Sequence, residues 1–146
     1  MPGGAIAVAS DHAGFDLKEI LKRDLQEAGH EVLDLGTHST DSVDYPDFGR
    51  AMGEAIASGK VARGVLVCGS GIGISIAANR NPKVRAALVH DETTARLSRE
   101  HNDANVVAFG ARVIGVEIAR EALKVFLTTD WLGGRHAGRV DKLSKG

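Results

Sequence analysis

The chain has 146 residues, of which 43% are hydrophobic and 25% charged, and its formal net charge is −1. This length and balance are typical of one globular domain that needs no metal or disulfide staple, and the charge argues against non-specific nucleic-acid binding. No run of about 18 apolar residues is present, and the first residues resemble no signal peptide, so we expect no membrane partner and a cytoplasmic location. The single cysteine, Cys68, is expected to remain a free thiol there.

The first half of the chain alternates short apolar runs with longer amphipathic segments. A strand is predicted over 5–9 and a helix over 15–28, which Gly29 ends. A second strand over 31–35 precedes a polar loop and a helix over 46–57. The third strand, over 64–68, leads through a glycine-rich turn into a short helix that ends at Ala78.

The second half repeats this alternation. Strands are predicted over 84–89 and 105–109, separated by a helix over 91–100 that Asp91 caps. A helix over 115–127 follows. Residues 131–146 are predicted to form a C-terminal arm of the single domain, which spans 1–146.

Strands that are apolar on both faces and alternate with helices indicate a parallel sheet covered on both sides. We therefore predict an α/β fold, a three-layer doubly wound (Rossmann/flavodoxin-like) sandwich with a five-stranded parallel sheet. The expected strand order is 2-1-3-4-5, with the fifth strand at the edge.

Open parallel sheets bind ligands at the carboxyl ends of their strands, beside the point where strand order reverses. In the predicted order this point lies between the first and third strands. The first strand ends in Ser10-Asp11-His12, and the third ends in Cys68 followed by the turn 69–73. We therefore expect these two segments to meet at one site.

The turn after the third strand has a structural and a functional interpretation. Its glycines could make only a tight strand–helix connection, or their amides could hold a phosphate or an oxyanion at the helix N-terminus. Cys68 could be a small core residue, as most buried cysteines are. Before a helix N-terminus it could equally be a thiolate that removes a proton from carbon.

The remaining polar candidates are also ambiguous when taken singly. Asp11 and His12 could be an acid–base pair or a helix cap with a surface histidine, and His101 with Asn102 could simply end a helix. Arg112, Arg135 and Arg139 suit a dianionic phosphate, or form a solvated basic face. The histidine and cysteine spacings match no metal site, so we expect no metal and no cofactor.

Several long motifs in order resemble the B-type ribose-5-phosphate isomerases, whose wider family includes galactose-6-phosphate and allose-6-phosphate isomerases. The motifs are ASDHAGFDLK, GTHSTDSVDYPDF, VCGSGIGISIAANR, SREHNDANVVAFGARVIG and GGRHAGRVDKL. They cover nearly the whole chain. The resemblance implies a phosphorylated sugar substrate and interconversion of ribose 5-phosphate and ribulose 5-phosphate in the pentose phosphate pathway.

The resemblance also implies roles for individual residues. Cys68 matches the proton-abstracting cysteine, and no acid follows it where another branch of the family has a glutamate. His101 matches the ring-opening residue, and Asp11 matches a contact to the substrate oxygens. The enediolate contacts implied are Ser70, the amides of Gly71, Ile72, Gly73 and Ile74, and Asn102. The phosphate contacts implied are His12, Arg112, Arg135 and Arg139.

Topology adds a prediction about assembly. Cys68 ends a strand, whereas His101 precedes one, so the two should lie at opposite edges of one sheet. We therefore expect His101 and Asn102 to enter the site from a second subunit, in a homodimer or a dimer of dimers, which agrees with the interface sites of the family. Which subunit supplies Arg135 and Arg139 is left open. The alternatives are an allose or galactose 6-phosphate isomerase and a non-catalytic phosphosugar-binding module.

Overall fold

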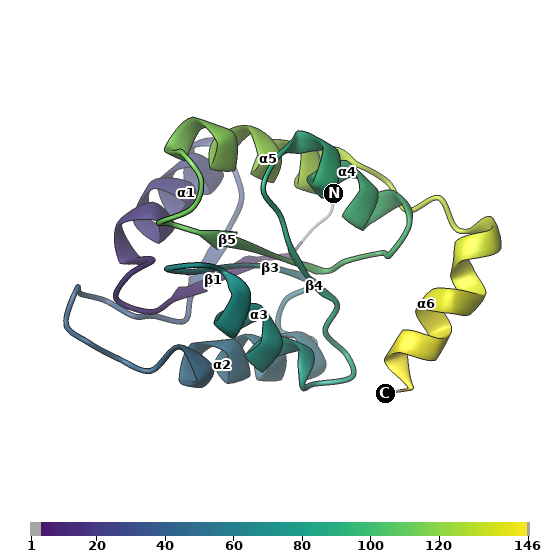
Figure 1. Ribbon diagram of the computed structural model, residues 1–146, viewed down its shortest axis with the longest axis horizontal. Coiled ribbons are helices and arrows are strands. Elements are labelled where there is room, and N and C mark those ends of the chain that lie inside the picture. Colours follow the sequence, from purple (N-terminus) through teal and green to yellow (C-terminus); the bar gives the residue numbers. More distant parts are fainter. Residues whose placement is uncertain (1–3, 146) are drawn as a thin grey trace.

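A computed structural model describes residues 4–145 and shows a five-stranded parallel sheet between two helix layers (Figure 1). The strands are β1 (Ile6–Ser10), β2 (Val32–Asp34), β3 (Arg63–Cys68), β4 (Ala86–Leu88) and β5 (Val106–Gly110). The helices are α1 (Phe15–Glu27), α2 (Tyr45–Ala57), α3 (Ile72–Asn79), α4 (Glu92–Glu100), α5 (Val116–Thr128), the 3₁₀ turn η1 (Gly134–His136) and α6 (Ala137–Ser144). The predicted fold class is confirmed, and no helix within the described residues is long and apolar enough to cross a membrane.

The predicted strand order is wrong for the last two strands. The observed order is β2-β1-β3-β5-β4, so β5 pairs with β3 and β4 lies at the edge. Burial explains the exchange, because all five residues of β5 are buried whereas the three residues of β4 are only partly buried. The longer, fully apolar strand takes the central position, where both of its faces are covered.

Crossover handedness then fixes which helix lies on which face. The chain moves in one direction across the sheet from β2 to β3 and from β3 to β4, so α2 and α3 pack together on one face. It moves in the opposite direction from β1 to β2 and from β4 to β5, which places α1 and α4 on the other face. There α5 packs against both of them (Figure 1).

Alternate strand residues supply the two halves of the core. Val8, Val67 and Phe109 pack with α1 and α5, whereas Leu66 and Cys68 pack with the α2 and α3 side. The Cys68 side chain therefore faces the α2–α3 layer and closes one end of its apolar cluster. The switch point lies between β1 and β3, because β1 leads away to β2 while β3 leads to β4.

Candidate active site

The carboxyl ends of β1 and β3 bring Asp11 beside the cysteine strand, as predicted. The two strands are paired with Ser10 opposite Val67, and the Asp11 N–H donates to the Val67 carbonyl at 3.3 Å. The Asp11 side chain is buried, and its Oδ1 accepts the Gly14 N–H at 3.0 Å. The carboxylate is thus fixed just before α1. Because Ser10 pairs with Val67, the next residues along the two strands, Asp11 and Cys68, follow side by side.

Cys68 is a buried free thiol whose sulfur has one defined partner. The Gly71 N–H donates to Sγ at 3.1 Å. Gly71 has a φ of +79°, and a Cβ there would lie 2.6 Å from Leu88 Cδ1, so only glycine fits this turn. The thiol therefore lies at the N-terminal end of α3 and is held there by a main-chain donor.

The rest of the turn divides the four amides predicted to bind an oxyanion. The Gly71 N–H is used by Cys68, and the Ile72 N–H donates to Ser70 Oγ at 3.1 Å. The Gly73 and Ile74 N–H groups, in the first turn of α3, have no acceptor among residues 4–145. These two amides are therefore the ones free to meet an anionic oxygen.

His12 is oriented by the loop that follows β2. Its Nδ1 accepts the Val43 N–H at 3.1 Å, so the neutral ring carries its proton on Nε2. Nε2 is then a hydrogen-bond donor, as a phosphate contact needs to be. The Arg112 guanidinium lies nearby in the fold, because a Cβ on Gly69 would sit 3.3 Å from its Nη1.

A buried ion pair supports the start of that loop. Lys18 is fully buried, and its Nζ lies 2.7 Å from Asp34 Oδ1, while Lys22 lies 2.9 Å from Oδ2. Asp34 also accepts the Gly36 N–H at 2.9 Å. Burial alone would raise the pKa of Asp34, but the hydrogen bonds from the two lysines and Gly36 outweigh it and lower the pKa. Ser10 then pairs with this segment through Gly36 O and the Thr37 N–H.

His101 and Asn102 lie at the opposite end of the strands, the amino end of the sheet. His101 ends α4, five positions before β5 begins opposite Gly64, whereas Cys68 pairs with Gly110 at the far end of β5. Four residue steps along β5 separate these ends by about 13 Å. One chain therefore does not bring Cys68 and His101 together, in agreement with the topological prediction.

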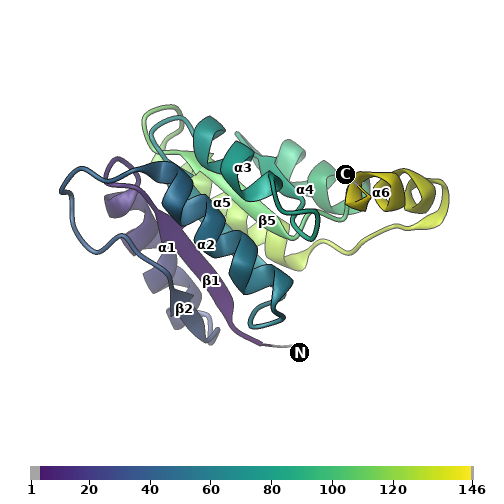
Figure 2. The same cartoon turned by 90° about the horizontal axis from the view of Figure 1, so that it is seen from below.

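The C-terminal arm lies beside His101. The His101 and His136 rings stack with their centroids 4.4 Å apart, and Trp131 lies 6.1 Å from His136. The Leu132 N–H donates to the Glu100 carbonyl, which joins the arm to the end of α4. Arg135 in η1 and Arg139 in α6 therefore belong with His101 rather than with Cys68. Figures 1 and 2 both show α6 standing outside the helix layers.

Two residues near these edges were not predicted from the sequence. The Tyr45 ring packs against Gly73, where it replaces the missing side chain at the start of α3. His136 is buried, and burial, with the charges of His101, Arg135 and Arg139, lowers its pKa. Tyr45 stands inside the DYP segment and His136 inside GGRHAGR, so both lie in motifs that carry the resemblance.

The chain was compared with known proteins. A family model described as Ribose/Galactose Isomerase matches residues 6–143. Ribose-5-phosphate isomerase B of Escherichia coli is 45% identical over 139 residues, covering 95% of this chain and 93% of the relative. D-erythrulose-4-phosphate isomerase of Pectobacterium atrosepticum is 41% identical over 140 residues, covering 95% and 92%.

A solved structure extends the comparison to the fold. The crystal structure of a ribose 5-phosphate isomerase from Thermotoga maritima superposes with a TM-score of 0.96 at 46% identity, covering 99% of this chain and all of that one. The match spans both sheet edges and the arm. Because the family model and the whole-length relatives agree, the chain belongs to the ribose/galactose isomerase family and is a sugar-phosphate isomerase.

Proposed function

We propose that the protein interconverts ribose 5-phosphate and ribulose 5-phosphate through an enediolate. The observation that carries this proposal is the Cys68 thiol, which accepts an amide from the turn and lies next to Asp11 at the switch point of the sheet. This arrangement would suit a base that removes a proton from a sugar carbon. Supporting it, the Escherichia coli relative and the Thermotoga structure both carry the name ribose 5-phosphate isomerase.

The reaction requires the furanose ring to open before carbon chemistry begins. His101 and Asp11 are assigned to move protons between the ring oxygen and the anomeric hydroxyl. Cys68 then takes the proton from C2, and the electron pair moves toward the carbonyl oxygen to give the enediolate. Ser70 and the free amides of Gly73 and Ile74 stabilise that oxygen. The proton of the C2 hydroxyl passes to O1, and Cys68 returns its proton to C1, which leaves the carbonyl at C2.

Substrate orientation is assigned to the phosphate, which is remote from the reacting carbons. His12 and Arg112 approach it from the Cys68 edge, while Arg135 and Arg139 approach it from the arm. Binding energy from this group can align C1 and C2 with the thiol.

A homodimer, alone or as a dimer of dimers, would bring the Cys68 end of one copy against the His101 end of another. The Cys68 edge of one copy would receive His101, Asn102, Arg135 and Arg139 from another. Large apolar side chains are exposed on the segments involved: Ile72 and Ile76 on α3, and Leu132 and Leu143 on the arm. Such side chains favour burial against a second copy. We further propose that the whole chain acts as one domain in the cytoplasm, where the thiol stays reduced.

A tetrose substrate is the second candidate, because one relative is named for erythrulose 4-phosphate. The same proton transfer between C1 and C2 would operate on the shorter chain, which needs no ring opening because its O4 carries the phosphate. Allose or galactose 6-phosphate would need a longer pocket. Turnover measured side by side on these sugar phosphates ranks them. The highest kcat/KM on a hexose or tetrose phosphate would replace ribose 5-phosphate as the substrate.

Isomerisation by the pure protein in EDTA, compared with Cys68→Ala, tests the chemistry. We expect the parent to be active without added metal and the variant to lose about 10²- to 10⁴-fold in kcat, the usual contribution of a positioned base. Cys68→Ser keeps the shape and serves as a packing control. Equal activity in parent and Cys68→Ala would remove the thiol from the mechanism. A parent inactive on all of these sugar phosphates would contradict the proposed isomerase.

A further inference from the structure

The turn that carries His101 contains a residue in an unusual backbone conformation. Asp103 has a φ of +47°, and it is the only non-glycine residue with positive φ in the described part of the chain. A residue with a side chain pays on the order of 1 kcal/mol for this region, so the surrounding structure must enforce it. Such an outlier beside functional residues calls for a physical cause.

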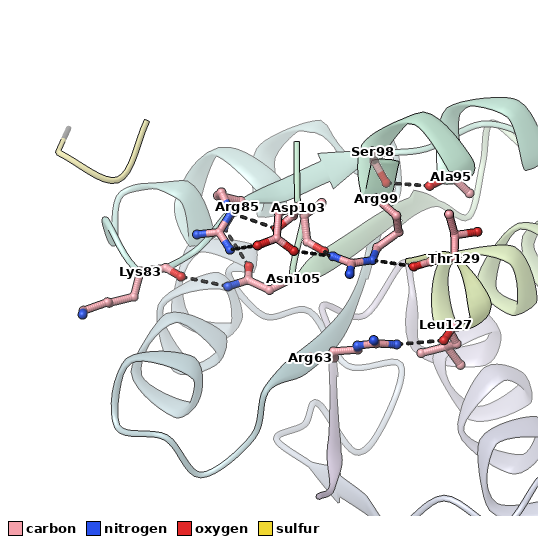
Figure 3. Close-up of polar contacts among 11 residues, drawn as sticks. Arg63, Lys83, Arg85, Ala95, Ser98, Arg99, Asp103, Asn105, Leu127 and Thr129 are labelled. Atoms are coloured by element: carbon pink, nitrogen blue, oxygen red, sulfur yellow. Dashed lines mark hydrogen bonds and ion pairs between the residues drawn. The ribbon is translucent and has the colours of Figure 1, made fainter. Parts of the chain in front are cut away.

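Two arginines hold Asp103 from opposite sides (Figure 3). Arg99 Nη1 donates to Oδ1 at 2.9 Å, and Arg85 Nη2 donates to Oδ2 at 3.3 Å. Arg85 Nε also donates to the Asp103 carbonyl at 2.8 Å. Both the carboxylate and the backbone of this residue are thus fixed, and the residue two positions earlier in the same turn is His101.

The same network reaches the root of the C-terminal arm. Arg99 is almost fully buried, and its Nε donates to the Thr129 carbonyl at 3.2 Å. Arg63 Nη1 donates to the Leu127 carbonyl at 2.8 Å (Figure 3). Burial and the nearby Arg99 charge lower the pKa of Arg63. The Asp103 carboxylate therefore offsets the positive charge gathered between the turn and the arm, together with Asp130 near Arg63.

We propose that Asp103, clamped by Arg85 and Arg99, is a positioning residue that aims His101 and Asn102 into the site of a second copy. The proposal rests on the function proposed above. The clamp fixes the turn, the turn fixes the His101 ring, and that ring stacks on His136 of the anchored arm. The network would therefore hold the whole partner-facing half of the site as one unit.

Three substitutions separate the backbone conformation from the charge. Asp103→Gly accepts positive φ but loses the carboxylate, Asp103→Asn tolerates positive φ and keeps one acceptor, and Asp103→Ala loses both. We expect kcat for ribose 5-phosphate to fall by about tenfold to a hundredfold in the Gly and Ala variants, and less in the Asn variant, because small misplacements of catalytic groups cost this much. Should Asp103→Ala fail to fold, Asp103→Gly and Arg85→Met decide the question.

Arg96→Gln is the matched control. It removes the exposed ion pair with Glu100 on the same helix and leaves the clamp intact. We expect parent kcat from it. If Asp103→Gly and Arg85→Met melt at lower temperature yet keep parent kcat while folded, the network is merely stabilising and the proposal is wrong.

An activity-independent readout separates this proposal from the proposed function. In the parent, a nuclear Overhauser effect is expected between the ring protons of His101 and His136, and it should weaken in Asp103→Gly. An unchanged signal would overturn the positioning role, whatever the enzyme acts on. A parent inactive on sugar phosphates, with the signal lost in Asp103→Gly, would instead refute only the proposed substrate chemistry.

Discussion

At the scale of single residues, the backbone decides what several side chains can do. Val43 donates to His12, Gly71 to Cys68 and Gly14 to Asp11. Under the proposed function, each bond leaves one atom of the side chain able to contact the substrate: Nε2 of His12, Sγ of Cys68 and Oδ2 of Asp11. On the Cys68 side of the proposed site, these three side chains are therefore oriented by main-chain donors.

The assignment of His12 Nε2 to the phosphate can be tested by two amides. His12→Asn can still accept from Val43 but lacks an atom at the Nε2 position, whereas His12→Gln reaches that position. We expect His12→Asn to raise KM for ribose 5-phosphate by about tenfold with little change in kcat, since phosphate binding is shared by ground and transition states. Steady-state kinetics on both variants measure this, and a KM rise in Gln but not in Asn would contradict the assignment.

His136 gives a pH dependence at the same scale. Its pKa lies below the usual value in the folded state, first because it is buried and then because His101, Arg135 and Arg139 oppose its charge. A lowered pKa means that the folded state favours the neutral ring. Its contribution to stability is therefore present above the unfolded pKa of about 6.5 and is lost as the pH falls below it.

Thermal denaturation of the parent and of His136→Phe between pH 8 and 5 checks this expectation. The variant keeps an aromatic ring on His101 and removes the titration. We expect the melting temperature of the parent to fall more steeply with acid than that of the variant. Parallel curves would show that folding does not shift the pKa of His136, which would contradict the expectation.

At the scale of elements, the pair formed by Lys18 on α1 and Asp34 at the end of β2 connects the core with the loop that holds His12. Lys18 is fully buried, so removing its partner leaves a charge that water does not reach. The loss of one member of such a pair commonly costs about 3 kcal/mol. Glu19 and Lys22 also contact the pair, so the whole cost does not fall on one bond.

Asp34→Asn is expected to lower the free energy of unfolding by about 3 kcal/mol at pH 7. The lowered pKa of Asp34 means that its contribution exists above the unfolded value of about 3.9 and disappears as pH falls through the folded value. The difference between parent and variant should therefore shrink near pH 3. Urea titrations at both pH values, with Lys22→Met as the partly exposed control, measure it; an equal difference at both pH values would contradict it.

Elements were more predictable from the sequence than their neighbours in the sheet. Periodicity and caps place β1 to β5 and α1 to α5 to within a few residues, and Asp91 caps α4 through the Thr94 N–H as predicted. The helical structure of the arm, η1 and α6, was not predicted. The predicted strand order is wrong for β4 and β5. The local sequence pattern does not show which of two apolar strands takes the central position. That choice depends on total burial, which only the assembled layers determine.

The candidate site was predictable where topology alone brings residues together. Asp11 meets the end of β3 because parallel strands share a carboxyl edge, and His101 lies apart from Cys68 for the same reason. Tyr45 and His136 were missed because their placement depends on how a loop and an arm fold back. The roles implied by the resemblance stay predictions until the variants are measured.

At the scale of the whole molecule, each chain holds two separated halves of the proposed site. Cys68→Ala and His101→Ala should each be inactive alone. Coexpressed, they form mixed dimers with one intact and one doubly defective site, so random pairing should restore about a quarter of the parent activity. Activity of the purified mixture measures this. Absence of any recovery, with mixed dimers present, would place both residues in one chain's site.

The separation of the two sheet edges has a consequence for when the chain becomes chemically competent. A single copy carries the proposed base, Cys68, at one end of the sheet and the proposed ring-opening residue, His101, at the other. Under the proposed assembly, catalysis is therefore governed by mass action between copies as well as by folding. A newly synthesised monomer would be inactive toward sugar phosphates, and dimerisation itself would be the activating step.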